Sequence, residues 1–398
     1  MPLRSGRSRS GFLFAALLLS PLQEARATTV TSSSAATTPV QSRIAAAVDE
    51  YRRKLQEYLA ARRKYEGEAR AYWNSIADKR RIRNAKRRNN QEILIDDYVL
   101  TQPPVYSGPR KPVDPTAPPE EPPPRYVPVV SDFLESAARE FHLVPEQPRS
   151  ESQYKRAYAV TASAAGLTRD QAVRIYAFES GGDGKYDVQA GLEQPTPGAR
   201  AVSTALGYNQ LLTTNSVELM AEKGNRFLEV LRAKAARRTG GASESLQKKI
   251  SVLKRMVDFS RSVPDDWSAH ERLAGTAKGL AIHALNLDLD VGPLLQTQKL
   301  LDSVEFARSR GYPGVLTAAE LEMMNLSGDG NGLAIVTMPP EWRDRVPTSN
   351  FFQQGGYERN PIVIRNNVVA KLLAATNAVM DKESRLPEAK ELAAYFPH

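Results

Sequence analysis

The sequence contains no cysteine, which excludes disulfide bonds, thiolate nucleophiles and cysteine-ligated metals. A chain of 398 residues without disulfides must be stabilised by its hydrophobic core. Histidine is scarce too, and its positions lack the spacing that is typical of a metal site. They are His142, His270, His283 and His398. We therefore expect no metal ion and no other cofactor.

Long apolar runs are also missing beyond the N-terminus, where no segment approaches the roughly 20 apolar residues that a membrane helix needs. At the N-terminus itself, three arginines precede an apolar run over residues 11–22, and Ala25 and Ala27 offer a small-x-small cleavage site. This pattern predicts a signal peptide over residues 1–27, with an uncleaved anchor as the alternative. The mature chain should then be periplasmic or secreted, without a transmembrane span.

Basic residues outnumber acidic ones, 54 against 45, which leaves a net charge of +9. In an exported protein this charge favours anionic envelope polymers or membrane surfaces as partners, and we do not expect nucleic acid. Seven of the basic residues crowd into residues 79–88, with no aromatic residue between them to stack a base. A solvated helix end and a clamp for an acidic polymer both fit this cluster.

A long amphipathic helix is predicted ahead of the main domain. Apolar and small residues recur there at alternating spacings of four and three, with one charged interruption. They are Ile44, Val48, Tyr51, Leu55, Tyr58, Arg62, Tyr65, Ala69, Tyr72 and Ile76. Because this seam is rich in tyrosine, a weak coiled coil or a helix docked on another surface fits as well as a stable dimer. Anionic envelope polymers or an envelope protein are its candidate partners.

The composition changes again after this helix. A proline-dense stretch favours extended polyproline II structure, and the helical patterns beyond it predict a mainly α-helical domain. Within that domain we expect one helix over residues 270–284 and a small hairpin between residues 332 and 363. The predicted segments are a signal peptide (1–27), a flexible stretch (28–42), an amphipathic and basic helical segment (43–100), a Pro-rich linker (101–130) and the helical domain (131–398).

The stretch IYAFESGG, residues 175–182, places a carboxylate on an apolar helix face. Glu179 follows Ile175 and Tyr176 at helical spacing, so it points where these apolar residues point. A capping box over residues 168–171 predicts the start of this helix, and the two glycines after the serine predict its end. The sequence therefore predicts a helix whose buried face ends in an acid.

The position of Glu179 favours a protonated carboxyl group. It lies in the last turn, where the negative end of the helix dipole disfavours an anion. Tyr176 and Phe178 limit its hydration, which disfavours ionisation further. A carboxyl group that is still protonated near neutral pH can act as a general acid. The alternative is that Glu179 turns outward or pairs with a nearby arginine such as Arg174.

Two motifs resemble the core of the soluble lytic transglycosylase family. Glu179-Ser180 matches the family's Glu-Ser at a helix end, and GYNQL, residues 207–211, matches its Gly-x-x-Gln followed by apolar residues. The resemblance spans only residues 153–221. It implies a lysozyme-like, mainly helical fold. It also implies cleavage of the β-1,4 bond between N-acetylmuramic acid and N-acetylglucosamine in peptidoglycan, with formation of a 1,6-anhydro ring.

The resemblance also implies residue roles, with peptidoglycan glycan strands as the substrate. Glu179 would act first as general acid and then as base. Tyr208 and Asn209 stand where the family usually has Leu-Met, and the family's later Ala-Tyr-Asn motif is absent, with Tyr357 and Asn360 as a possible substitute. The expected catalytic residues are Glu179 and Tyr357, and the expected substrate-binding residues are Ser180, Gly207, Tyr208, Asn209 and Gln210.

Two other functions stay open on the sequence alone. A hydrolase with two carboxylates could use Asp183 or Glu193 beside Glu179. A catalytically inactive glycan-binding or scaffold protein of the envelope could keep the lysozyme-like fold, and the missing Ala-Tyr-Asn motif favours that alternative.

Overall fold

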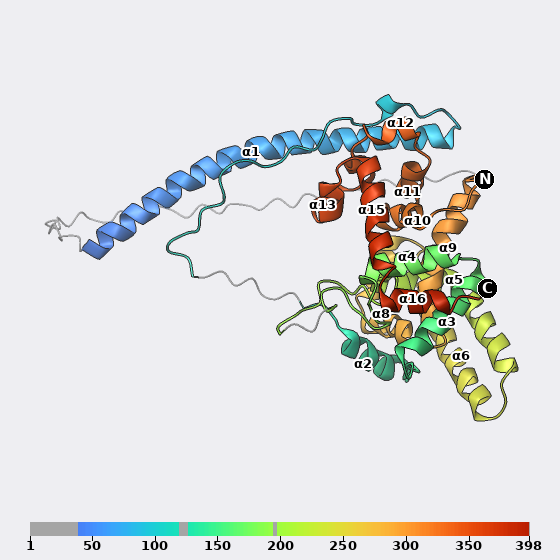
Figure 1. Ribbon diagram of the computed structural model, residues 1–398. Coiled ribbons are helices and arrows are strands. Elements are labelled where there is room, and N and C mark those ends of the chain that lie inside the picture. Colours follow the sequence, from blue (N-terminus) through green and yellow to red (C-terminus); the bar gives the residue numbers. More distant parts are fainter. Residues whose placement is uncertain (1–38, 119–125, 194–196, 398) are drawn as a thin grey trace, which may run out of the picture. The chain divides into compact units, whose positions relative to one another are not determined.

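The computed structural model describes residues 39–118, 126–193 and 197–397 (Figure 1). The predicted signal peptide and most of the predicted flexible stretch lie outside these residues. The described residues form two compact units, one from residues 39–58 and 110–118, the other from residues 59–109 and from residue 126 onward. No helix in the described part of the chain is long and apolar enough to cross a membrane.

The described residues are mainly helical, and their only β pairings are three isolated bridges. The long α1 (Pro39–Arg88) is followed by shorter helices (Figure 1). The α-helices that follow are α2 (Val130–Phe141), α3 (Glu151–Ala165), α4 (Arg169–Ser180), α5 (Thr213–Ala236), α6 (Gly241–Ser260), α7 (Trp267–Ala274), α8 (Ala277–His283), α9 (Gly292–Ser309), α10 (Ala318–Ser327), α11 (Asp329–Val336), α12 (Pro340–Arg343), α13 (Gln354–Glu358), α14 (Pro361–Arg365), α15 (Val369–Glu383) and α16 (Pro387–Ala394). Three 3-10 turns are η1 (Ile95–Asp97), η2 (Ala284–Leu287) and η3 (Thr348–Phe351).

The part of α1 beyond residue 58 is docked on the helical body. Ala69 and Ile76, two of the predicted seam residues, are only 3% and 1% exposed. Tyr72 continues the contact, because its hydroxyl lies 2.7 Å from the Ser349 hydroxyl. By contrast, Ile44 in the first unit is 52% exposed.

Two arginines at the basic end of α1 make contacts inside the protein. Arg83 is buried, stacks 4.4 Å from the Tyr98 ring centroid and donates to the main-chain oxygens of Asp97 and Asn350. Burial lowers the Arg83 pKa to about 10. Arg80 likewise donates to the Phe352 oxygen at 2.7 Å. The interpretation as a solvated helix end was wrong for these two arginines, because main-chain oxygens of Asn350 and Phe352 accept their hydrogen bonds. The clamp for an acidic polymer stays a prediction for the cluster.

Two predictions for the helical domain were wrong. The expected single helix over residues 270–284 is two helices, α7 and α8, because Thr276 caps the second one by accepting from the Gly279 amide at 3.1 Å. The expected hairpin is absent from the described residues, since its two apolar runs lie in α11 and α14. The first run lies in α11, which packs closely on α10 at Gly332. A Cβ at this position would lie 2.2 Å from the Cα of Met324. The two helices α10 and α11 therefore leave no space for a side chain at position 332.

Three clusters of buried apolar residues form the core. The first is built mainly from α2, α5, α6 and α8, and the second from α3, α4, α9, α10, α15 and α16. The third joins the docked part of α1 to η3, α13, α14 and α15. The loop before α5 connects the first two, because Leu206 and Leu211 belong to one cluster and Tyr208 to the other.

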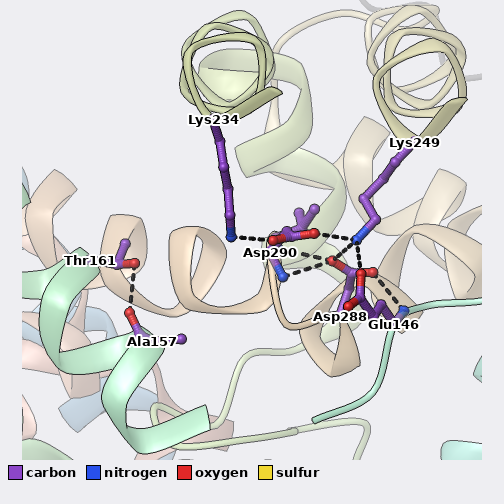
Figure 2. A network of polar contacts seen from close by, with 8 residues as sticks. Glu146, Ala157, Thr161, Lys234, Lys249, Asp288 and Asp290 are labelled. Atoms are coloured by element: carbon purple, nitrogen blue, oxygen red, sulfur yellow. Dashed lines mark hydrogen bonds and ion pairs between the residues drawn. The ribbon is translucent and has the colours of Figure 1, made fainter. Parts of the chain in front are cut away.

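A buried ion network ties the α5–α6 pair to the start of α9 (Figure 2). Lys249 on α6 lies 3.0 Å from an Asp288 oxygen and 2.6 Å from an Asp290 oxygen. Lys234 on α5 pairs with the other oxygen of Asp290. Although burial opposes ionisation, these lysines hold the pKa of Asp290 below its usual value. Burial raises the pKa of Asp288, against the pull of Lys249.

We predict that Lys249→Met lowers the free energy of unfolding by about 3 to 5 kcal/mol, because it leaves two buried carboxyl groups without their shared cation. Urea denaturation at neutral pH measures the change. The neighbouring Lys248 is exposed, so Lys248→Met should change stability by less than about 0.5 kcal/mol. Equal effects of the two substitutions would show that the network does not stabilise the fold.

Candidate active site

A cleft of about 1040 Å3 opens beside the end of α4. Its walls come from the end of α4, the face of α5, the middle of α9 and the end of α10. The loop over residues 203–212, Trp267 and residues 359–360 complete it. Glu179 and Gln210, one from each of the two recognised motifs, both line this cleft.

The helix that carries Glu179 begins and ends where the sequence predicts. The Thr168 hydroxyl accepts from the Gln171 amide at 3.1 Å, and the Gln171 side chain accepts from the Thr168 amide at 3.0 Å, which confirms the capping box. Gly181 and Gly182 end the helix with φ of 69° and 75°. A Cβ at Gly182 would lie 2.5 Å from the Glu383 carbonyl oxygen, so this glycine also lets α4 approach the end of α15.

The Glu179 side chain is half-buried and faces the cleft. Its Oε1 accepts a hydrogen bond from Asn325 Nδ2 of α10 at 2.5 Å. The alternative pairing with Arg174 is wrong, because that arginine pairs with Asp381 at 2.8 Å. The carboxyl group is therefore anchored to α10 on one side and open to the cleft on the other.

A second carboxyl group, which our sequence reasoning missed, lies behind the first. Glu322 is completely buried in α10, and Asn325 Nδ2 lies 3.4 Å from each of its oxygens. One amide group thus links the carboxyl groups of Glu179 and Glu322. A signal existed, since Glu322 interrupts the apolar run LEMM of α10 as Glu179 interrupts its own helix.

Burial controls the protonation of this pair. It raises the pKa of Glu179, although Lys299 and the Asn325 hydrogen bond act in the opposite direction. Burial raises the pKa of Glu322 further, and the neighbouring charge of Glu179 adds to the increase. Because Glu322 has no exposed surface, it retains its proton more strongly, and Glu179 titrates beside a neutral partner. The site can therefore present a protonated acid to a ligand in the cleft.

The Gly-x-x-Gln motif forms a tight turn that brings only its glutamine to the cleft. Gln210 adopts φ of 45°, and its side chain donates to the Gly207 carbonyl at 2.8 Å. Gly207 has φ of 79°, and a Cβ there would lie 2.6 Å from the Gln296 side-chain nitrogen. The structure thus explains this glycine by the turn and by packing on α9, and Gly207 is not among the residues that line the cleft.

The two residues inside the motif are core residues, which corrects their expected role in substrate binding. Tyr208 is completely buried, packs edge-to-face on three other tyrosines and donates to Glu151. Asn209 is also completely buried, and its side chain donates to the Gln296 carbonyl at 2.8 Å. Asn209 still affects the cleft, because its own carbonyl accepts from Lys299 Nζ at 2.7 Å.

Ser180 and Tyr357 also lie away from the cleft. The buried Ser180 hydroxyl donates to the Tyr176 carbonyl at 2.6 Å, so the serine packs inside its own helix. Tyr357 is 5% exposed, and its ring lies 5.5 Å from that of Trp73 in a different hollow. Neither residue can touch a ligand beside Glu179. Of the proposed substitute motif, Asn360 is the residue that reaches the cleft.

The two carboxylates considered as hydrolytic partners are not in the cleft either. Asp183 is exposed, and Glu193 accepts from the Gly191 amide in the loop after α4. Other acids line the cleft instead, which the sequence could not single out. Burial and the charges of neighbouring acids raise the pKa of Glu218 to about 7. The other acids of the lining are Glu222, Asp302 and Asp329.

An exposed aromatic ring completes the wall of the cleft. Trp267, at the start of α7, lines it and is 44% exposed. Such a ring offers an apolar face at a polar surface.

The described residues hold no group of three or more histidine and acidic side chains that could bind a metal ion.

Comparisons with known proteins identify no relative. No family model, curated protein or solved structure matches this chain. Function must therefore be argued from the cleft and its residues.

The pKa of Glu179 should depend on Lys299. Lys299→Met removes a cation that favours the ionised carboxyl group, so the pKa of Glu179 should rise further. Lys299→Arg keeps the positive charge and should therefore change the pKa of Glu179 less. Carboxyl-carbon NMR against pH, with Glu179→Gln to assign the signal, measures both values. A pKa that is unchanged in Lys299→Met would contradict the electrostatic account.

Proposed function

We propose that the protein is an exported peptidoglycan lytic transglycosylase with a lysozyme-like helical fold. One observation carries the proposal. Glu179 is a half-buried acid with a raised pKa, and it lies on the wall of a large cleft that Gln210 also lines. This is the arrangement that a general acid needs to protonate a leaving glycosidic oxygen. Because the substrate lies outside the cytoplasm, the protein would act in the periplasm or after secretion.

The reaction needs only one acidic residue to handle protons. Glu179 first donates its proton to the oxygen that leaves the anomeric carbon of N-acetylmuramic acid. The acetamido carbonyl of the substrate can assist at that carbon, so a second carboxylate nucleophile is not required. The Glu179 carboxylate then removes the proton of the C6 hydroxyl as that oxygen closes the 1,6-anhydro ring. The proton balance closes, and no water is consumed.

The neighbours of Glu179 have separate roles in this proposal. Asn325 holds the carboxyl group in place from α10. Lys299 limits the rise in the pKa of Glu179, so that the carboxylate can form when the proton leaves. Gln210 provides its side-chain oxygen as an acceptor for a saccharide hydroxyl, because its Nε2 donates to the carbonyls of Val188 and Gly207. Trp267 provides an apolar face on which a sugar ring can stack.

A second candidate function is hydrolysis, and one observation favours it. Glu218 lines the same cleft and has a pKa of about 7, which suits a general base for water. A hydrolase would release reducing ends, whereas a lytic transglycosylase releases 1,6-anhydro ends. An inactive glycan-binding protein of the envelope would bind sacculi without releasing either product.

We predict that Glu179→Gln lowers the release of muropeptides from purified sacculi by about 100- to 10,000-fold, because the amide keeps the shape and loses the proton. Mass spectrometry of the soluble products measures the release and should find anhydro ends with the wild type. Glu193→Gln, outside the cleft, is the matched control and should keep the wild-type rate. Reducing ends would support the hydrolase, and full activity of Glu179→Gln would exclude Glu179 as the acid.

Trp267→Ala should raise the KM for glycan strands about three- to tenfold with a smaller effect on kcat, because it removes a stacking surface and leaves the acid in place. Trp267→Phe should restore most of the loss. Release rates over a series of strand concentrations separate the two parameters. A loss confined to kcat would show that Trp267 does not act by binding the sugar.

A further inference from the structure

A second hollow, of about 270 Å3, lies between the docked part of α1 and the α13–α14 region. It belongs wholly to the second unit of the chain. Aromatic rings form much of its wall, and they come from three separate segments. The rings are those of Tyr65, Trp73, Tyr106 and Tyr357.

The rings are held in place before any ligand arrives. Tyr65 and Tyr106 meet edge-to-face with centroids 5.4 Å apart, and the Arg62 guanidinium lies 5.1 and 5.4 Å from the two centroids. Trp73 packs on Tyr357 in the same way, at 5.5 Å. A rigid aromatic wall binds a ligand without first losing side-chain entropy.

Three of these rings remain partly open to the hollow, and polar groups stand beside them. Tyr65, Trp73 and Tyr106 are half-buried, whereas the side chains of Gln102 and Glu358 on the same wall are exposed. Sugar rings have apolar C–H faces and hydroxyl edges. Aromatic faces with neighbouring amide and carboxylate groups therefore match a saccharide better than a purely apolar ligand.

Neighbouring residues of one segment line this hollow and the cleft that holds Glu179. Tyr357 and Glu358 line the aromatic hollow, and the next two residues, Arg359 and Asn360, line the cleft. Consecutive Cα atoms are only about 3.8 Å apart, so one short segment of chain contributes to both hollows. A strand bound across this segment would have contacts in both.

We propose that the aromatic hollow is a second glycan-binding subsite, which holds a distal part of a strand whose cleaved bond lies in the cleft. The inference rests on the proposed function, because it takes the same polymer as ligand. In this proposal Tyr65 and Trp73 contact only long strands, whereas short saccharides bind in the cleft alone. The other occupant to test is a proline-rich peptide, since Pro103 and Pro104 of the chain itself line the hollow.

The experiment compares long and short ligands on Glu179→Gln protein, which keeps the strands intact. Tyr65→Ala in this background should weaken the binding of peptide-free glycan strands about tenfold in calorimetry and leave the binding of a chitin tetrasaccharide unchanged. Leu59→Ala is the matched control, because Leu59 is 44% exposed on the same helix and does not line the hollow. Equal affinity of the Tyr65→Ala and Leu59→Ala variants for long strands would overturn the proposal.

A second measurement avoids dependence on the substitution. In Glu179→Gln protein without any further substitution, the indole NMR signal of Trp73 should shift when long strands are added. It should not shift when the tetrasaccharide is added. A shift with a proline-rich peptide alone would overturn the saccharide assignment.

The proposed catalysis and the proposed subsite can fail separately. Absence of muropeptide release by the wild type would count against catalysis, whereas an unshifted Trp73 signal in strand-saturated protein would count against the subsite.

Discussion

The carboxyl group of Glu179 and the buried carboxyl group of Glu322 share one amide donor, Asn325, and the arrangement of the cleft depends on that contact. Two carboxyl groups so close together in a dry environment cannot both ionise easily, so at least one proton is retained. Complete burial assigns that proton to Glu322 and leaves Glu179 to exchange its own with the cleft. The end of α4 contacts α10 through Asn325, and Gly182 lets the same end of α4 approach the end of α15.

The other wall of the cleft is positioned by buried polar contacts. The Gln296 side chain accepts from the Asn209 amide and donates to the Leu206 carbonyl, so α9 holds the Gly-x-x-Gln turn in register. The same turn returns the Asn209 carbonyl to Lys299, whose charge acts on Glu179. In this motif Asn209 thus holds Lys299, the cation that lowers the pKa of Glu179.

Several basic residues at the end of α1 make contacts inside the protein. Arg80 and Arg83 use their donors on main-chain oxygens near η3, and Lys86 pairs with Asp97 at 2.5 Å. Guanidinium groups suit this task, because one planar group can satisfy several carbonyls at once. The docking that they help to stabilise also brings Tyr65 and Trp73 next to α13, where the aromatic hollow forms.

Local signals were enough to predict a mainly helical chain, the capping box at Thr168 and the apolar face that ends in Glu179, because each depends on residues within about two turns. They failed for the apolar run that starts at Leu333, where close packing of α11 on α10 overrides β propensity. No local pattern could place Glu322 beside Glu179, bury Tyr208 or move Tyr357 out of the cleft. Those outcomes depend on contacts between segments far apart in the chain, and only the packed core decides which side chains meet and which lose their water.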